Sequence, residues 1–259
     1  MRTLKSPREV ELMRVSGRVV AQALSVARSK CVPGVTTQEI DQAVEEVFRE
    51  HSALSLFKGY PGPKSEFPSV ICISVNEEVV HGIPGQRQIR EGDIVSIDTG
   101  CKIAGWCGDS AITVMVGEVD PEVRRLVQIT EEVLQLAIDE MANQERWSQV
   151  AEKMECYVRD AGFSSVENYV GHGIGQALHE EPQIPNFVNA ALRRNDVLLE
   201  PGLVVAVEPM VNMGSKETYP CSDGWTVVTK DGKPSAHCEH TVAITPDGVR
   251  ILTELDEQG

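Results

Sequence analysis

The chain has 259 residues, and its 24 Lys and Arg residues against 39 Asp and Glu residues give a formal charge of −15 at pH 7. A hydrophobic content of 41% and a charged content of 24% are typical of a globular protein and exclude a disordered chain. The acidic charge argues against a nucleic-acid partner, because binding of nucleic acid requires Lys and Arg to neutralise phosphates.

Two helices are predicted at the start of the chain. Ser6 and Glu9 match a capping box around Pro7, and apolar residues then recur on one helical face. Thr36 and Glu39 repeat the capping pattern after a Pro-Gly break. The chain therefore begins with a pair of helices.

The same arrangement recurs after residue 120. Asp120 and Pro121 begin a long segment with helical apolar periodicity, and Ser148 begins a shorter one that closes at Gly162. Six runs with the composition of β-strands lie between and after the helix pairs, at residues 70–73, 94–97, 112–116, 203–207, 225–228 and 241–244.

The two halves of the chain also share three landmarks in the same order. Each half has an HGI tripeptide, an apolar run that ends in an acid, and an acid that precedes a second apolar run. The first half has them at residues 81–83, Asp98 and Asp109, and the second at residues 172–174, Glu208 and Glu239. This internal repeat predicts one domain over residues 1–259, made of related halves at about 6–117 and 120–253.

The four repeated acids are candidate metal ligands. A single acid is most often a solvated surface carboxylate. If the halves pack about a pseudo-twofold axis, however, the four acids converge, and like charges brought together need a cation. His172 lies between glycines that allow close backbone approach, so it is the natural imidazole donor, although a hydrogen-bonded structural histidine is the alternative. Such a donor set suits two divalent ions, with Mn, Fe, Co or Zn favoured over Mg or Ca.

Other common catalytic motifs are absent from the sequence. It contains no dinucleotide fingerprint, no phosphate-binding P-loop and no G-x-S-x-G elbow. Residues 179–183 do not form the H-E-x-x-H motif of zinc proteases, because Gln183 holds the fifth position and Pro182 would break the helix. The remaining interpretation is a dinuclear metal hydrolase, in which a metal-bound hydroxide attacks a carbonyl group.

The chain resembles the type I methionine aminopeptidases over nearly its whole length, up to Thr253. The motifs that carry the resemblance are Ser74-Val75-Asn76-Glu77 leading to His81-Gly82-Ile83-Pro84, Asp98 with Asp109, Gly171-His172-Gly173-Ile174-Gly175 running to His179-Glu180-Glu181-Pro182, Glu208-Pro209-Met210, Asp223-Gly224-Trp225-Thr226, and Glu239-His240-Thr241. The resemblance implies an α/β (α+β) pita-bread fold, in which a curved antiparallel sheet is flanked by two helix pairs with internal pseudo-twofold symmetry.

The resemblance also implies roles for individual residues. Five residues would bind the two metal ions, namely Asp98, Asp109, His172, Glu208 and Glu239, with Asp109 and Glu239 bridging them. Glu208 would also act as general base. His179 would donate to the developing oxyanion, and His81 would lie near the scissile amide. Four residues would surround a pocket for the methionine side chain, with ordinary core packing as their alternative role: Tyr60, Phe67, Cys72 and Trp225.

Two departures from the family pattern are visible. Val80 stands before His81 where the family often has cysteine, and segment 59–68 is longer than in the shortest bacterial members. The first leaves the metal ligands untouched, whereas the second bears on the pocket residues Tyr60 and Phe67. No zinc-finger cysteines precede the catalytic region, so ribosome association through such an extension is not expected.

The sequence predicts the setting in which the protein acts. The longest aliphatic stretch, at 203–207, is far shorter than the roughly 20 residues of a membrane-spanning helix. Segment 1–5 lacks the apolar core of a signal peptide. The 7 cysteines are scattered without a CxxC motif, as is typical of free thiols in a reducing compartment. We expect a cytoplasmic monomer with no membrane partner.

The predicted activity is removal of the amino-terminal methionine from nascent proteins and peptides when the next residue is small, by attack of a metal-bridging hydroxide on the scissile carbonyl. A proline-directed peptidase of the same fold is the nearest alternative enzyme, although the NEEVVHGIP stretch and Glu239-His240-Thr241 favour the methionine class. A metal-free binding protein that lost catalysis is the alternative from another class.

Overall fold

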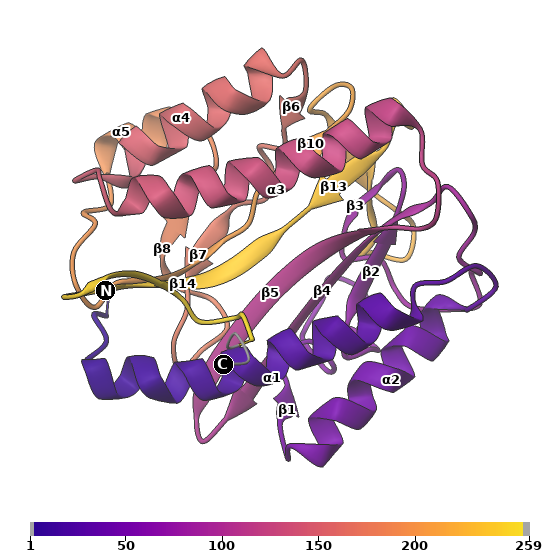
Figure 1. Ribbon diagram of the computed structural model, residues 1–259, viewed down its shortest axis with the longest axis horizontal. Helices are drawn as coiled ribbons and strands as arrows, with labels where there is room; N and C mark the ends of the chain where they lie inside the picture. Colours follow the sequence, from indigo (N-terminus) through magenta and orange to yellow (C-terminus); the bar gives the residue numbers. More distant parts are fainter. Residues whose placement is uncertain (1–2, 256–259) are drawn as a thin grey trace.

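The computed structural model describes residues 3–255, so residues 1 and 259, the outer limits of the predicted domain, lie outside the described residues. The described chain forms four long helices and one short one: α1 (Pro7–Lys30), α2 (Thr37–Glu50), α3 (Pro121–Met141), α4 (Trp147–Asp160) and α5 (Ala190–Arg194). Figure 1 shows the pairs α1–α2 and α3–α4 running along opposite sides of a group of long central strands. Among residues 3–255, no helix combines the length and apolar character needed to cross a membrane.

The helix caps confirm the sequence prediction at three of four positions. The side chains of Ser6 and Thr36 accept the backbone N–H groups of the residues three positions on, and Asp120 caps α3. The fourth helix begins at Trp147, one residue before the predicted start. Ser148 does not cap it, because its hydroxyl donates to Asp196 at 2.6 Å.

Nine antiparallel strands form the main sheet: β1 (Leu54–Ser55), β2 (Cys72–Val75), β4 (Ile94–Ile103), β5 (Trp106–Met115), β7 (Gly171–Gly173), β8 (Glu180–Ile184), β9 (Val204–Val207), β14 (Glu239–Thr245) and β15 (Gly248–Ile251). Their order is β1-β4-β5-β14-β9-β7-β8, with β2 also on β4 and β15 also on β14. Two small sheets contain β6 (Ser164–Ser165), β10 (Met210–Asn212) and β13 (Ser235–His237), and β3 (Glu78–Val80), β11 (Thr218–Pro220) and β12 (Val227–Thr229).

Two strands begin two residues later than predicted because an acid side chain takes the backbone groups in front of them. Asp41 accepts the N–H groups of Val70 and Ile71, so β2 starts at Cys72. Asp223 likewise accepts the N–H groups of residues 225 and 226, so β12 starts at residue 227. These side-chain hydrogen bonds replace the strand ladder locally.

The hairpin of β4 and β5 is longer than the two apolar runs that predicted it. Ile103 pairs with Trp106 across a turn whose residues Ala104 and Gly105 have φ of 49° and 87°, the positive values that a tight hairpin turn requires. The additional strand residues, 98–103 and 106–111, include polar residues, so they lack the apolar pattern that predicted the rest of the hairpin. The hairpin joins β14 through only two residue pairs, Glu239 with Ala111 and the pair next to it.

Helix α1 lies against β5 and the chain near Leu252 with almost no space between the backbones. A Cβ atom on Gly17 would lie 2.0 Å from the Leu252 carbonyl oxygen, and one on Gly108 would lie 2.7 Å from the Gly17 nitrogen. Ser16 also donates from its hydroxyl to the Trp106 carbonyl at 2.8 Å. The first helix pair is therefore fixed to the sheet at its glycines.

We expect Gly17→Ala to lower the free energy of unfolding by about 3 kcal/mol, because the new methyl group cannot be accommodated without moving backbone. Urea unfolding followed by circular dichroism measures the change. Gly85→Ala is the matched control: a Cβ there meets nothing within 4 Å, so its effect should stay within about 0.5 kcal/mol. Equal effects of the two substitutions would contradict the proposed close contact.

Candidate active site

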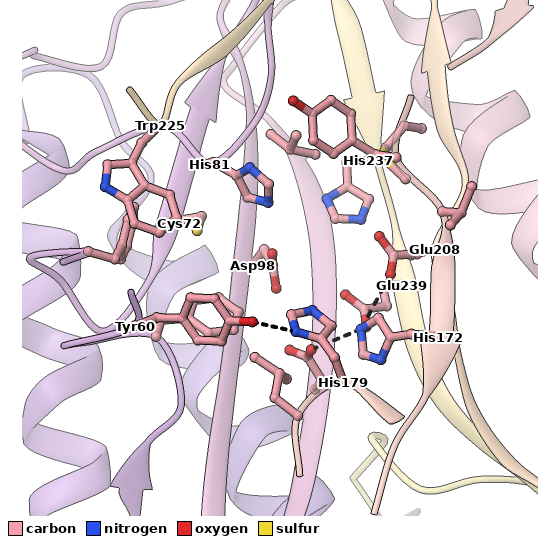
Figure 2. Close-up of a pocket in the computed structure, with 18 residues that line it drawn as sticks. Tyr60, Cys72, His81, Asp98, His172, His179, Glu208, Trp225, His237 and Glu239 are labelled. Carbon is pink, nitrogen blue, oxygen red and sulfur yellow. Dashed lines mark hydrogen bonds and ion pairs between the residues drawn. The ribbon is translucent and has the colours of Figure 1, made fainter. Parts of the chain in front are cut away.

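Five adjacent strands each bring one predicted ligand to the same part of the sheet. The residues are Asp98 on β4, Asp109 on β5, Glu239 at the start of β14, Glu208 directly after β9, and His172 on β7. Figure 2 shows the labelled members of this group side by side. The strand order β4-β5-β14-β9-β7 therefore turns residues that are 141 positions apart in the chain into neighbours.

The distances within this group are short enough for a shared ion. The Nε2 atom of His172 lies 3.5 Å from a Glu208 carboxylate oxygen and 3.9 Å from an Asp109 oxygen. Asp109, His172 and Glu239 offer ligand atoms that all lie within 4.8 Å of one another. Asp98 and Glu208 line the same pocket.

The acids are held in an environment that is unfavourable for bare carboxylates. Burial raises the pKa of Asp98, Glu208 and Glu239 well above the usual range, and the charge of Asp109 raises each of them further. Burial also raises the pKa of Asp109 to about 7. One buried oxygen each of Asp98, Asp109 and Glu239 has no hydrogen-bond partner in the described chain. Buried, unpartnered carboxylate oxygens next to an imidazole fit a bound divalent cation.

His172 is prepared to act as a neutral ligand. Its Nδ1 atom donates to the Gly173 carbonyl oxygen at 3.0 Å, which leaves the lone pair of Nε2 facing the acids. Burial lowers the pKa of His172 to about 4. Glycines flank it because a Cβ on Gly171 would lie 2.4 Å from the Ala206 carbonyl oxygen. The glycine-rich segment is thus a strand enclosed between its neighbours.

The two other predicted histidines border the same pocket. His81 follows β3 with a left-handed backbone, φ 59°, and its ring meets those of Tyr169 and Trp225 edge to face at centroid distances of 5.5 and 6.3 Å. Burial lowers the pKa of His81 to about 4. His179, between β7 and β8, lies edge to face with His172 at 4.4 Å between ring centroids.

The segment that carries His179 is anchored to the amino-terminal part of the chain. Lys5 is buried, and its ammonium group pairs with Glu180 at 2.7 Å. The other oxygen of Glu180 accepts the N–H groups of Gln176 and Ala177. The backbone on both sides of His179 is therefore held by one ion pair and two hydrogen bonds.

All four predicted pocket residues line the cavity, of about 220 Å³, that contains the acids: Tyr60, Phe67, Cys72 and Trp225. The rings of Phe67 and Trp225 meet edge to face at 5.1 Å, and the Trp225 indole donates to the Ser65 carbonyl at 3.2 Å. The cavity joins an apolar end to the acid cluster.

Sequence reasoning missed seven further lining residues: Phe57, Val80, Tyr169, Val170, Leu178, Met210 and His237. His237 is the one that the pattern could have revealed, because it lies two residues before Glu239 in extended chain and so faces the same side. Its Nε2 atom is buried and has no hydrogen-bond partner in the described chain. Figure 2 shows its ring across the pocket from Cys72 and Tyr60.

The buried acids and the imidazole form a candidate metal site on an antiparallel sheet. The model of metallopeptidase family M24 matches residues 11–246, so the chain is a member of this class of metallopeptidases. Methionine aminopeptidase 1 of Bacillus subtilis is 46% identical over 253 residues, which cover 97% of this chain and 98% of that protein. Methionine aminopeptidase of Clostridium perfringens is 44% identical over 250 residues, covering 96% and 98%. The chain belongs to the methionine aminopeptidases of family M24.

Solved structures confirm the predicted pita-bread fold. Methionine aminopeptidase of Thermotoga maritima superposes with a TM-score of 0.92 at 41% identity, over 98% of this chain and all of that chain. Prolidase from Pyrococcus furiosus superposes with a TM-score of 0.75 over 99% of this chain and 66% of that chain, but at 20% identity. The likeness to prolidase shows a common fold alone.

Proposed function

We propose that the protein removes the amino-terminal methionine from peptides and nascent proteins when the next residue is small. The observation that carries this proposal is the joining of the apolar end of the cavity to the acid cluster, so that a buried side chain would bring its own carbonyl group to the acids. The identity of 46% with a methionine aminopeptidase supports the methionine class over the proline-directed alternative.

Five residues would hold two divalent ions: Asp98, Asp109, His172, Glu208 and Glu239. Asp109 and Glu239 would be shared between the ions, as the family resemblance implies, and both lie with His172 in the group whose ligand atoms are within 4.8 Å of one another. Carboxylate oxygens with one imidazole favour Mn, Fe, Co or Zn. Such ions, when bound, would activate water and polarise the substrate carbonyl group.

The other side chains would move protons and orient the peptide. Glu208, with its carboxylate beside His172, takes the proton of the attacking water as general base. His179 donates a hydrogen bond to the carbonyl oxygen as negative charge develops there. His81, on the opposite side of the pocket from His179 in Figure 2, assists departure of the new amine.

Two walls of the cavity support the proposed selectivity. The apolar end, with Phe67, Cys72 and Trp225, suits an unbranched, polarisable thioether. On the other side of the cavity, His237 and Met210 are paired in register and both line the wall, so we assign the second residue of the substrate to this side. A large second side chain would collide with this wall.

We also propose that the protein works as a cytoplasmic monomer, without a nucleic-acid or membrane partner, and as one domain of two related halves. The free state of its seven cysteines supports a reducing compartment. The net charge of −15 speaks against binding to phosphates.

The protein is expected to release methionine from Met-Ala-Ser, but to leave Ala-Pro-Ser and Met-Leu-Ser largely intact. Chelation should abolish the release, and Mn or Co should restore it, because the acids need their cations. Chromatography of free amino acids measures each reaction. Release that survives complete metal stripping would exclude the metal mechanism, and cleavage of Ala-Pro-Ser alone would exclude the proposed specificity.

A further inference from the structure

The hydroxyl group of Tyr60 lies 2.9 Å from Nδ1 of His179, and the two rings meet edge to face at a centroid distance of 5.6 Å. Tyr60 belongs to the long 59–68 segment, whereas His179 follows β7, 119 positions further along the chain. Figure 2 shows His179 between Tyr60 on one side and the acid cluster with His172 on the other. His179 therefore has a different partner on each side of its ring: Tyr60 on one side and His172 on the other.

A neutral imidazole has one N–H group and one lone pair, so a hydrogen bond at one nitrogen decides what the other can do. If Tyr60 donates to Nδ1, the proton of His179 must be on Nε2. Nε2 can donate to a substrate carbonyl oxygen only if it carries the proton. The donor role proposed for His179 therefore requires that Tyr60 donates its hydroxyl proton to Nδ1.

We infer that Tyr60 is a positioning residue, which fixes the tautomer and orientation of His179 so that Nε2–H points to the substrate carbonyl oxygen. The inference rests on the proposed role of His179 as a hydrogen-bond donor. It gives the long 59–68 segment two tasks, because the same residue borders the methionine pocket and prepares the histidine that acts on the bond next to it.

The chain holds the Tyr60 hydroxyl in place through its backbone. Tyr60 donates its N–H group to the Phe57 carbonyl oxygen at 2.8 Å, and its own carbonyl oxygen accepts the N–H group of Phe67 at 2.9 Å. The segment also packs on Trp225 so closely that a Cβ on Gly62 would lie 2.1 Å from the indole. The 59–68 segment that brings Tyr60 to His179 is therefore held by backbone hydrogen bonds and by its packing on Trp225.

Tyr60→Phe should lower kcat for Met-Ala-Ser roughly tenfold and leave KM within about twofold, because the ring that borders the pocket remains. Tyr219→Phe removes the same hydroxyl group from an exposed residue on β11 and should change neither constant. A kcat for Tyr60→Phe within twofold of the wild-type value would overturn the inference. A rise in KM with unchanged kcat would assign Tyr60 to the pocket wall alone, and would overturn it too.

The tautomer can be measured without activity. In protein labelled with ¹⁵N-histidine, at about pH 8 and so above the ordinary histidine pKa of ~6.5, the His179 shifts should show a protonated Nε2 and an unprotonated Nδ1. Tyr60→Phe should show a mixture of tautomers, and His179→Ala assigns the signals. An unchanged pure tautomer in Tyr60→Phe would overturn the inference. Failure of the wild-type protein to release methionine would instead contradict the proposed function, and the tautomer result would stand by itself.

Discussion

Glu239→Gln is expected to abolish methionine release, with a fall in kcat/KM of roughly 10³-fold. The side chain lies in the closest group of candidate ligands, and its Oε1 atom is buried without a hydrogen-bond partner in the described chain. The amide keeps the shape of the carboxylate but removes its charge and cannot bridge two cations. Steady-state release of methionine from Met-Ala-Ser measures the effect.

The metal content of the same variant separates a lost ligand from a lost fold. Calorimetric titration with Mn should give two ions for the wild-type protein and fewer for Glu239→Gln, with unchanged circular dichroism. Glu152→Gln, an identical change on an exposed residue of α4, should leave activity and metal content unaltered. Near-normal turnover or two tightly bound ions in Glu239→Gln would show that the bridging assignment is wrong.

Asp109→Asn is expected to stabilise the metal-free protein at about pH 8. Burial raises the pKa of Asp109 from 3.8 to about 7, so between these values the folded protein keeps a proton that the unfolded chain has released. Because the folded state then binds more protons, its stability falls as the pH rises through this window. The free energy of unfolding falls by something on the order of 4 kcal/mol across this window. The neutral amide of Asp109→Asn avoids this loss.

The difference between the two proteins contains this effect together with a stabilising change at Asp98, Glu208 and Glu239, whose pKa values the charge of Asp109 raises. Buried histidines such as His81 and His172, whose pKa values are lowered to about 4, change stability with pH in the opposite sense. They are present in both proteins and cancel in the difference. Urea unfolding with chelator should show no difference near pH 4 and a growing advantage for Asp109→Asn above it. Millimolar Mn should reverse the order at about pH 8, since the wild-type protein with its full ligand set gains more binding energy than Asp109→Asn. An advantage independent of pH would contradict the buried-carboxylate explanation.

The sequence was most informative where local chemistry decides structure. The capping residues Ser6 and Thr36 act within one helical turn, so their pattern predicted both helix starts. The internal repeat identified the acids because it compares positions across the halves, and the sheet order then explains why Asp98 and Glu208 meet.

Other features depend on contacts that no local pattern contains. The β7 strand is three residues long and glycine-rich, and it is extended because it pairs with β8 on one side and β9 on the other. Likewise, Asp41 shortens β2 from a helix 29 positions away. Phe57 and Leu178 lie in loops, outside the helices and strands, and both line the pocket. Their positions became visible only with the structure.

The narrow joint between β5 and β14 affects how the molecule loses activity. In the backbone ladder, two residue pairs connect these strands. The hydroxyl groups of Thr241 and Ser110 add hydrogen bonds to the backbone of Asp109 and Glu239, respectively. Local opening of this joint would separate Asp109 from Glu239 while both helix pairs stay folded. Loss of the site therefore demands less free energy than global unfolding, and thermal inactivation can precede any change in helix content.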